Sequence, residues 1–202
     1  MNTPFRYSSN QRSASNQKPS SSKGMTLIEV LVAMFILTTG ILGAVAMQAS
    51  VKKGSFDATQ RSLASTLAQD ILERMRSNDP TLLRLNAYNG TYGNGDASET
   101  LPSPSCTSST TLCTWQQMVV KDLYEWEVSL MGADVKNGLD STGGLVGAVA
   151  CIEHLNNNVD IVISWQGREE MTDGAASNSA FAKACGEEST KRRQIVVNAF
   201  IF

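Results

Sequence analysis

The sequence predicts an α+β protein in which a long N-terminal helix packs on a small antiparallel β-sheet. Three observations lead to this fold class. An almost uncharged apolar run covers residues 25–47, a helical repeat of apolar residues continues from it to residue 78, and strand-like segments occur toward the end of the chain. With 202 residues, the chain has room for one ordinary domain beside such a helix.

The apolar run at residues 25–47 contains a single charged residue, Glu29. A helix of that length is about 34 Å long, which is enough to cross the hydrocarbon core of a membrane, about 30 Å thick. A carboxylate inside that core costs roughly 3 kcal/mol, so Glu29 is a candidate functional residue. The simpler alternative is that its side chain reaches the nearby membrane surface.

Residues 1–24 form a polar, basic leader for which the sequence predicts no regular structure. The leader carries four basic residues and no acid, whereas the whole chain has a net charge of -2, so the rest of the chain is acidic. The basic side of a span stays in the cytoplasm, which places the residues after it on the far side of the membrane. An acidic chain is a poor general binder of nucleic acid.

All four cysteines follow the span. The basic leader predicts that they lie on the far side of the membrane, and that side is oxidising. They allow two disulfides in three connectivities, among which the sequence does not choose. A bond between Cys106 and Cys113 could close the end of a loop. One between Cys151 and Cys185 would tie a later loop to a strand and stabilise the domain by about 2 to 4 kcal/mol. Metal binding is the alternative, but no C-x-x-C pair occurs.

Residues 48–79 are predicted to continue the helix as an amphipathic segment. The apolar residues recur every three or four positions until Pro80 prevents further helix. One helix from about Met25 to Asn78 follows, and its second half is expected to pack on a domain. A heptad coiled coil is the alternative, but alanines and polar residues occupy many of the seam positions and make it less favoured. The predicted packing face consists of Phe56, Gln60, Leu63, Ala64, Leu67, Ala68, Ile71, Leu72 and Met75.

Residues 80–202 are predicted to form a globular head. Its first part is rich in Gly, Asn, Ser, Thr and Pro, which indicates a long loop with tight turns. A second helix and then three strands are expected after it, and the first two strands pair as a hairpin. The predicted segments are the loop 80–113, the helix 112–130, the strands 145–155, 159–165 and 194–202, the turn 156–158, and a polar loop at 167–193.

The sequence shows no motif of a catalytic site, so we expect no enzymatic activity, no metal and no cofactor. The one histidine, His154, has no nucleophile motif to pair with and is expected on the surface of a strand. Trp115 and Trp126 lie at helical spacing and are expected in the core. The basic run at residues 191–193 is expected to protect a strand edge rather than to bind DNA.

Around residue 24 the sequence resembles the type IV prepilin signal. A basic leader, Gly24, the apolar Met25 and Glu29 occur in that order before an apolar span. The resemblance implies that a prepilin peptidase cuts between Gly24 and Met25, that the new amine of Met25 is methylated, and that Glu29 pairs with the amine of a neighbouring subunit during assembly. Such a pair removes two buried-charge penalties at once. An ordinary signal peptide cut after Ala46 is the alternative, which the acid and the long apolar run disfavour.

The wider pattern through Gln48 looks like the PilV-type minor pilins. This resemblance implies a pilin fold and a low-copy subunit that primes type IV pilus assembly with other minor pilins and the major pilin, at or near the tip. Before assembly it would lie in the bacterial inner membrane with a periplasmic head, and the pilus would serve functions such as twitching motility. Two alternatives stay open: a head that acts in cell adhesion or DNA binding through loops 80–113 and 167–193, and a minor pseudopilin of type II secretion.

Helix-weakening residues gather in the middle of the span. A glycine costs up to about 1 kcal/mol inside a helix, and threonine can bond back to the preceding turn. The pattern indicates either a soft point in the helix or a place where helices pack closely, and the sequence does not rank these two. The residues are Thr38, Thr39, Gly40 and Gly43.

Overall fold

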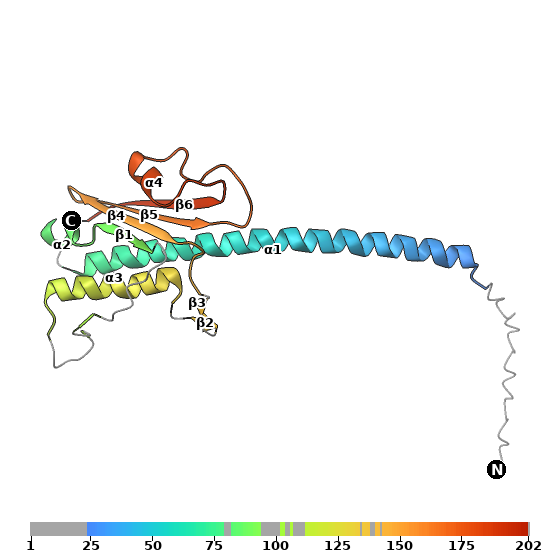
Figure 1. The fold of residues 1–202 in the computed structure, drawn as a ribbon, viewed down its shortest axis with the longest axis horizontal. Helices are drawn as coiled ribbons and strands as arrows, with labels where there is room; N and C mark the ends of the chain where they lie inside the picture. The colour runs from blue at the N-terminus through green and yellow to red at the C-terminus, as the bar shows by residue number, and fades with distance from the viewer. Residues whose placement is uncertain are drawn as a thin grey trace, which may run out of the picture. The chain divides into compact units, whose positions relative to one another are not determined.

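The structure is a computed structural model, and its first helix, α1 (Leu27–Ser77), is the long helix that the sequence predicts. The chain divides into two compact units, Met1–Ala46 and Met47–Phe202, and α1 contributes to both (Figure 1). The structure describes residues 24–78, 82–93, 102–103, 106, 112–133, 135–137, 140–141 and 143–201.

The part of α1 that belongs to the second unit buries one face. All of its buried residues lie on the predicted packing face, because positions three and four apart share one side of a helix. Ser77 ends the helix one residue before the predicted end, just ahead of Pro80. The buried residues are Gln60, Ala64, Leu67, Ala68, Ile71, Leu72 and Met75.

Helix α3 (Trp115–Met131) matches the second predicted helix and has well-defined ends. Thr114 and Gln117 form a capping box, in which each side chain accepts a hydrogen bond from the backbone N–H of the other residue. Gly132 ends the helix with a φ of 67°. A Cβ there would lie 1.8 Å from the backbone nitrogen of Gly144, so only glycine allows this close approach.

Four strands form one antiparallel sheet in the order β1-β4-β5-β6, which confirms the predicted fold class. The β4–β5 hairpin turns at Asn156 and Asn157, whose φ values of 51° and 66° are ones that asparagine tolerates. Two short strands pair separately. The bounds are β1 (Gly90–Gly93), β4 (Val149–Leu155), β5 (Asn158–Gln166) and β6 (Arg192–Phe200), with β2 (Lys136–Asn137) and β3 (Asp140–Ser141) apart from them.

The predicted loop at residues 80–113 was wrong in part. The structure places α2 (Leu82–Asn86) and β1 within it, and Tyr88 between them is fully buried. Strand β1 reads Gly-Thr-Tyr-Gly, and its two terminal glycines disfavour a strand, so pairing with β4 is needed to stabilise it.

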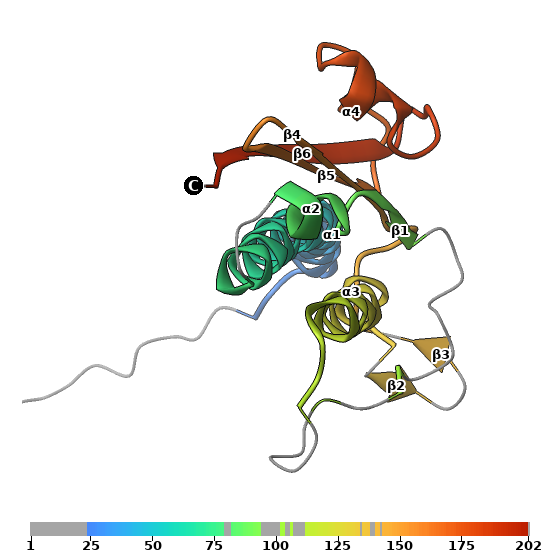
Figure 2. The same ribbon diagram turned by 90° about the vertical axis from the view of Figure 1, so that its left-hand side faces the viewer.

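The sheet separates two apolar clusters. Helices α1 and α3 lie on one face of the sheet and α4 (Ala180–Ala184) lies on the other (Figure 2). Trp126 is fully buried in the larger cluster, where its Nε1 donates to the carbonyl oxygen of Leu67 at 2.8 Å, so its predicted place in the core is confirmed. Trp115 is only partly buried against the same cluster.

A polar cluster joins α1 to α3. Arg74 reaches Asp122 at 3.3 Å and Glu125 at 3.0 Å, and Asp122 is itself buried. Tyr88 donates its hydroxyl to the second carboxylate oxygen of Asp122 at 2.9 Å, and burial raises the pKa of this phenol. Because removal of one partner leaves a buried charge or donor without its bond, the cluster sets the register between the two helices.

Arg192 corrects the expectation that residues 191–193 only protect a strand edge. Its side chain is 6% exposed and pairs with Asp173 at 2.8 Å. It also donates to the carbonyl oxygens of Lys183 and Gly186. The guanidinium holds the pKa of Asp173 down at about 2. Arg192 therefore organises the segment between β5 and β6 from inside.

We predict that Arg192→Met lowers the free energy of unfolding by about 3 kcal/mol, because the partly buried Asp173 loses its cation and the carbonyl oxygens of Lys183 and Gly186 lose their donor. Arg193→Met, at a more exposed pair with Asp57, is the control and costs less. Urea denaturation at neutral pH measures both. The double variant Arg192→Met/Asp173→Asn should lose less stability than Arg192→Met and Asp173→Asn lose in sum. Strictly additive losses would contradict the pairing of Arg192 with Asp173.

Candidate assembly site

The predicted processing site lies immediately before α1. Gly24 and Met25 are exposed and precede the first helical residue. Thr26 caps the helix: its backbone carbonyl accepts from the N–H of Glu29 at 3.1 Å and of Val30 at 3.2 Å, and its hydroxyl lies 3.4 Å from the Glu29 nitrogen. Glu29 therefore sits at the third helical position, where the helix dipole favours a negative charge.

The cap explains how the sequence positions Glu29. Thr-Leu-Ile-Glu at residues 26–29 has the spacing of a capping box, although among the described contacts only the threonine half is formed. The backbone of Glu29 is held by the cap, and its carboxylate forms no hydrogen bond or ion pair with another described residue. The side chain is exposed at the start of the apolar segment.

Every residue from 27 to 47 is exposed, including its large apolar side chains. This part of α1 is long and apolar enough to cross a membrane. Leu27 and Phe35, for example, are 81% and 69% exposed. A contiguous apolar surface of this kind marks contact with lipid or with other protein.

The helix continues through the glycines and threonines in the middle of this segment. The hydroxyls of Thr38 and Thr39 donate to the carbonyl oxygen of Phe35, each at 3.0 Å. A Cβ added at Gly40 or Gly43 would meet nothing within 4 Å. Open space beside both glycines suits the approach of a second helix, whereas the threonine bonds are those that weaken or bend a helix.

The cysteines form two pairs, Cys106 with Cys113 and Cys151 with Cys185. The second pair joins β4 to the end of α4 and belongs to the smaller apolar cluster, together with Val162. It therefore fastens the segment between β5 and β6 on the face of the sheet opposite α1.

The same segment is also fastened to α1 within the second unit. The guanidinium of Arg168 lies 3.9 Å from the ring centre of Phe56, and its backbone N–H donates to Asp57 at 3.3 Å. Lys53 and Glu169 pair at 3.9 Å on the surface. With Arg192 and the disulfide, these contacts hold much of residues 167–192 as a fixed part of the head.

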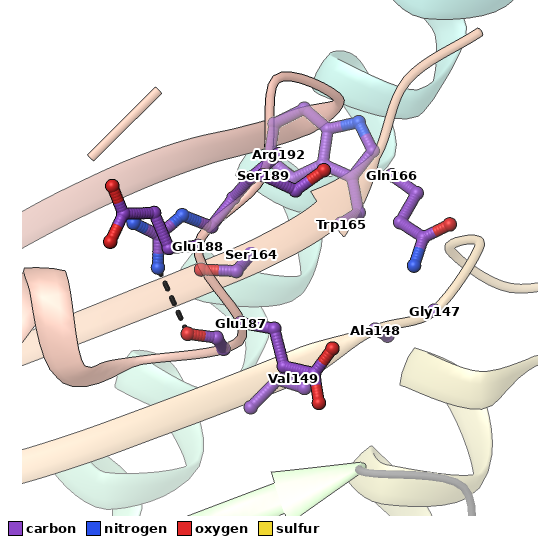
Figure 3. A pocket seen from close by; sticks show the side chains of 11 residues that line it. Gly147, Ala148, Val149, Ser164, Trp165, Gln166, Glu187, Glu188, Ser189 and Arg192 are labelled. Carbon is purple, nitrogen blue, oxygen red and sulfur yellow. Dashed lines mark hydrogen bonds between the residues drawn. The ribbon is translucent and has the colours of Figure 1, made fainter. Parts of the chain in front are cut away.

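A hollow of about 430 Å³ lies beside this segment, at the start of β4 and the end of β5 (Figure 3). Its one buried charged side chain, Arg192, already pairs with Asp173. Glu187 and Glu188 at its rim are exposed. Among the described residues, no group of three or more His, Cys, Asp or Glu is arranged to hold a metal ion.

His154 is buried, so its predicted surface position was wrong. Its side chain faces the main core, with Nδ1 2.7 Å from the Asn86 amide oxygen and Nε2 buried without a partner. Because that oxygen only accepts, Nδ1 carries the proton of the neutral ring. Burial lowers the pKa of His154. No local pattern predicted this contact, because Asn86 lies on α2, which was itself not predicted.

Comparison with known proteins gives a match to a family model. The prokaryotic N-terminal methylation motif, which is the prepilin-type signal, matches residues 19–45. The match covers the predicted Gly24–Met25 bond and Glu29, and it marks the chain as type IV pilin-like, in the class of pilins and pseudopilins. Such a signal implies processing by a prepilin peptidase, and with the apolar helix it indicates membrane anchoring and pilin assembly. No curated protein and no solved structure matches the chain.

We predict that the head loses stability as the pH falls below about 6.5, the ordinary pKa of histidine. In the folded state the pKa of His154 is lowered, so the unfolded chain binds the proton first and stability is fully present only above that pH. Urea denaturation at pH 7.5, 6.5 and 5.5 measures the loss. His154→Asn, which can keep a donor toward Asn86 but does not titrate, should show a shallower pH dependence; an identical slope would rule out His154 as the cause.

Proposed function

We propose that the chain is a minor pilin of the PilV type, which helps to prime assembly of a type IV pilus and is incorporated at or near its tip. In this proposal it works with other minor pilins and the major pilin and has no enzymatic activity. Before assembly the head lies in the periplasm, and the span at residues 25–47, in the first part of α1, lies in the inner membrane. The observation that carries the proposal is the prepilin-type signal directly followed by an uncovered apolar helix.

The chemistry of Glu29 supports a role in assembly. Its backbone is capped by Thr26 and its carboxylate is free to contact another molecule. In an apolar environment a lone carboxylate and a lone amine are both costly, and a pair of them is much less so. The methylated amine of Met25 on a neighbouring subunit is the partner that we assign to Glu29.

An adhesive or DNA-binding role of the head receives less support from the second predicted loop. Residues 167–192 are held by Arg192, by the Cys151–Cys185 disulfide and by contacts with α1. A segment fixed at so many points is suited to maintaining the shape of the head. Of the first predicted loop, residues 80–81, 94–101, 104–105 and 107–111 lie outside the described residues.

We predict that intact-mass analysis of the protein purified from its native membrane gives a chain that begins at Met25 with a methyl group on its amine. Gly24→Ser is the matched variant and should leave the full leader in place, since the bond to be cut follows residue 24. A chain that begins at Met47 would contradict the proposal and favour an ordinary signal peptide cut after Ala46.

We predict that Glu29→Ala and Glu29→Gln both reduce surface pili by about tenfold or more, as expected if a buried ion pair is lost. Glutamine keeps the hydrogen-bonding groups that suit this helix position and removes only the charge. Thr26→Ala, which weakens the cap and keeps the carboxylate, is the control and should retain most pili. Counting pili by electron microscopy at equal protein levels measures the effect. Normal piliation with Glu29→Gln would show that the charge is not what assembly requires.

A further inference from the structure

The two edges of the main sheet differ in how they are protected. Strand β1 has four residues, and the carboxylate of Glu127 accepts from the N–H of Gly93 at 2.8 Å. Strand β6 at the other edge has nine residues and, within the described part of the chain, pairs with β5 alone. From Gln194 to Phe200 it contains no charge and no proline, which are the usual means of blocking an edge.

The backbone groups that face outward from β6 can be identified from its neighbours. Gly167 N–H donates to the carbonyl of Lys191 on the β5 side, whereas Gly174 N–H donates to the carbonyl of Arg192 on the outer side. Backbone groups alternate in direction along a strand, so those of Val196 and Asn198 also face outward. Among the described residues, no hydrogen bond to these outward groups is present.

Apolar side chains lie along this edge on both faces of the sheet, with Asn198 among them on the face opposite α1. Ile195 and Val197 are partly buried against the main core on the α1 face. On the opposite face Val196 is 36% exposed, Phe200 is 49% exposed, and Leu155 on β4 is 65% exposed. A strand added beside β6 would cover apolar surface as well as backbone groups.

Two acids on the same face lie without a cation. Glu153 and Asp160 are directly opposite each other in the β4–β5 pair, an arrangement that like charges disfavour. Neither forms an ion pair within the described part of the chain, and Asp160 accepts only from the amide of Asn198. A hollow of about 380 Å³ is lined by these three residues and by Leu155, Asn156 and Asn158.

We propose that the outer edge of β6 receives an extended strand from a different pilin-like subunit. The added strand pairs with the backbone of Val196 and Asn198, places apolar side chains beside Ile195 and Val197, and carries a lysine or arginine that reaches Glu153 and Asp160 in the hollow. This inference deepens the proposed function and rests on it.

A second copy of this chain does not fit this role. Two copies can join β6 to β6 through a two-fold axis in an antiparallel pair, which reverses the second half of α1 in one copy relative to the other. Copies that are anchored in the same membrane by the N-terminal end of α1 all have the same orientation, which an antiparallel pair does not allow. The β1 edge of a second copy has only four residues, and one of its outward N–H groups is already used by Glu127. The partner is therefore a different subunit.

The test uses the full chain in its native cells, with p-benzoylphenylalanine, a photoreactive analogue of phenylalanine, in place of Phe200. We expect an adduct with an extended segment of another protein that carries a prepilin-type signal. The same probe in place of Thr91, exposed on the β1 edge, should give none. No adduct at position 200, or an adduct only with a second copy, would overturn the inference.

Variants at Val196 test whether backbone pairing holds the partner. Val196→Pro removes an outward N–H and leaves the hydrogen bonds to β5, so the adduct should fall by about tenfold. Val196→Lys places a charge on the edge and should have a similar effect. Circular dichroism shows whether each variant is folded. A folded Val196→Lys chain that crosslinks at the original yield would overturn the inference, whatever the fate of the proline variant.

The outcome can be separated from that of the proposed function. If the chain assembles pili but β6 receives no strand, Glu29→Gln abolishes pili while Val196→Lys leaves both pili and crosslinking unchanged. If the chain does not assemble pili, Glu29→Gln leaves their number unchanged. Reduced crosslinking in Val196→Lys together with few pili in Glu29→Gln supports both.

Discussion

The structure depends on α1, one part of which is covered by the head while the other exposes an apolar surface that needs cover. The second part of α1 buries a face of small and apolar side chains against α3 and the sheet, which holds the head together. The first part has the same helical geometry and exposes its apolar side chains on all sides. The chain itself offers no cover for that surface among the described residues. Lipid before assembly and other subunits after it are the two environments that meet the requirement.

The β-sheet lies between the second part of α1 and the segment that carries α4. Its α1 face supplies much of the main core, and its other face holds a smaller cluster beneath α4. So small a cluster contributes little burial, and the segment between β5 and β6 relies on polar and covalent links instead. Arg192, paired with Asp173, and the disulfide from Cys151 to Cys185 supply these links. The shape of this face is therefore set by a few specific contacts.

The sequence predicted the parts of the fold that depend on local periodicity. The buried face of α1, the α3 helix and the β4–β5 hairpin follow from repeats of 3.6 and 2 residues and from a turn at Asn156 and Asn157. It did not predict β1, because glycine-rich strands form only when a neighbour pairs with them. His154 and Arg192 were misplaced for a related reason. Their burial is created by partners distant in sequence, Asn86 and Asp173, which no local pattern connects to them.

The prepilin-type signal could be recognised in the sequence because its residues lie close together along the chain. Thr26 and Glu29 are one helical turn apart, so the sequence that marks the processing site also caps the helix it releases. The cap uses the backbone of Glu29 and leaves the carboxylate at the end of the helix where the dipole is positive. Among the described residues, that end of the helix supplies no cation to pair with the carboxylate. In the function that we propose, a carboxylate without a cation at the rim of an apolar surface gains most from an amine brought by another chain, so that assembly would complete this site.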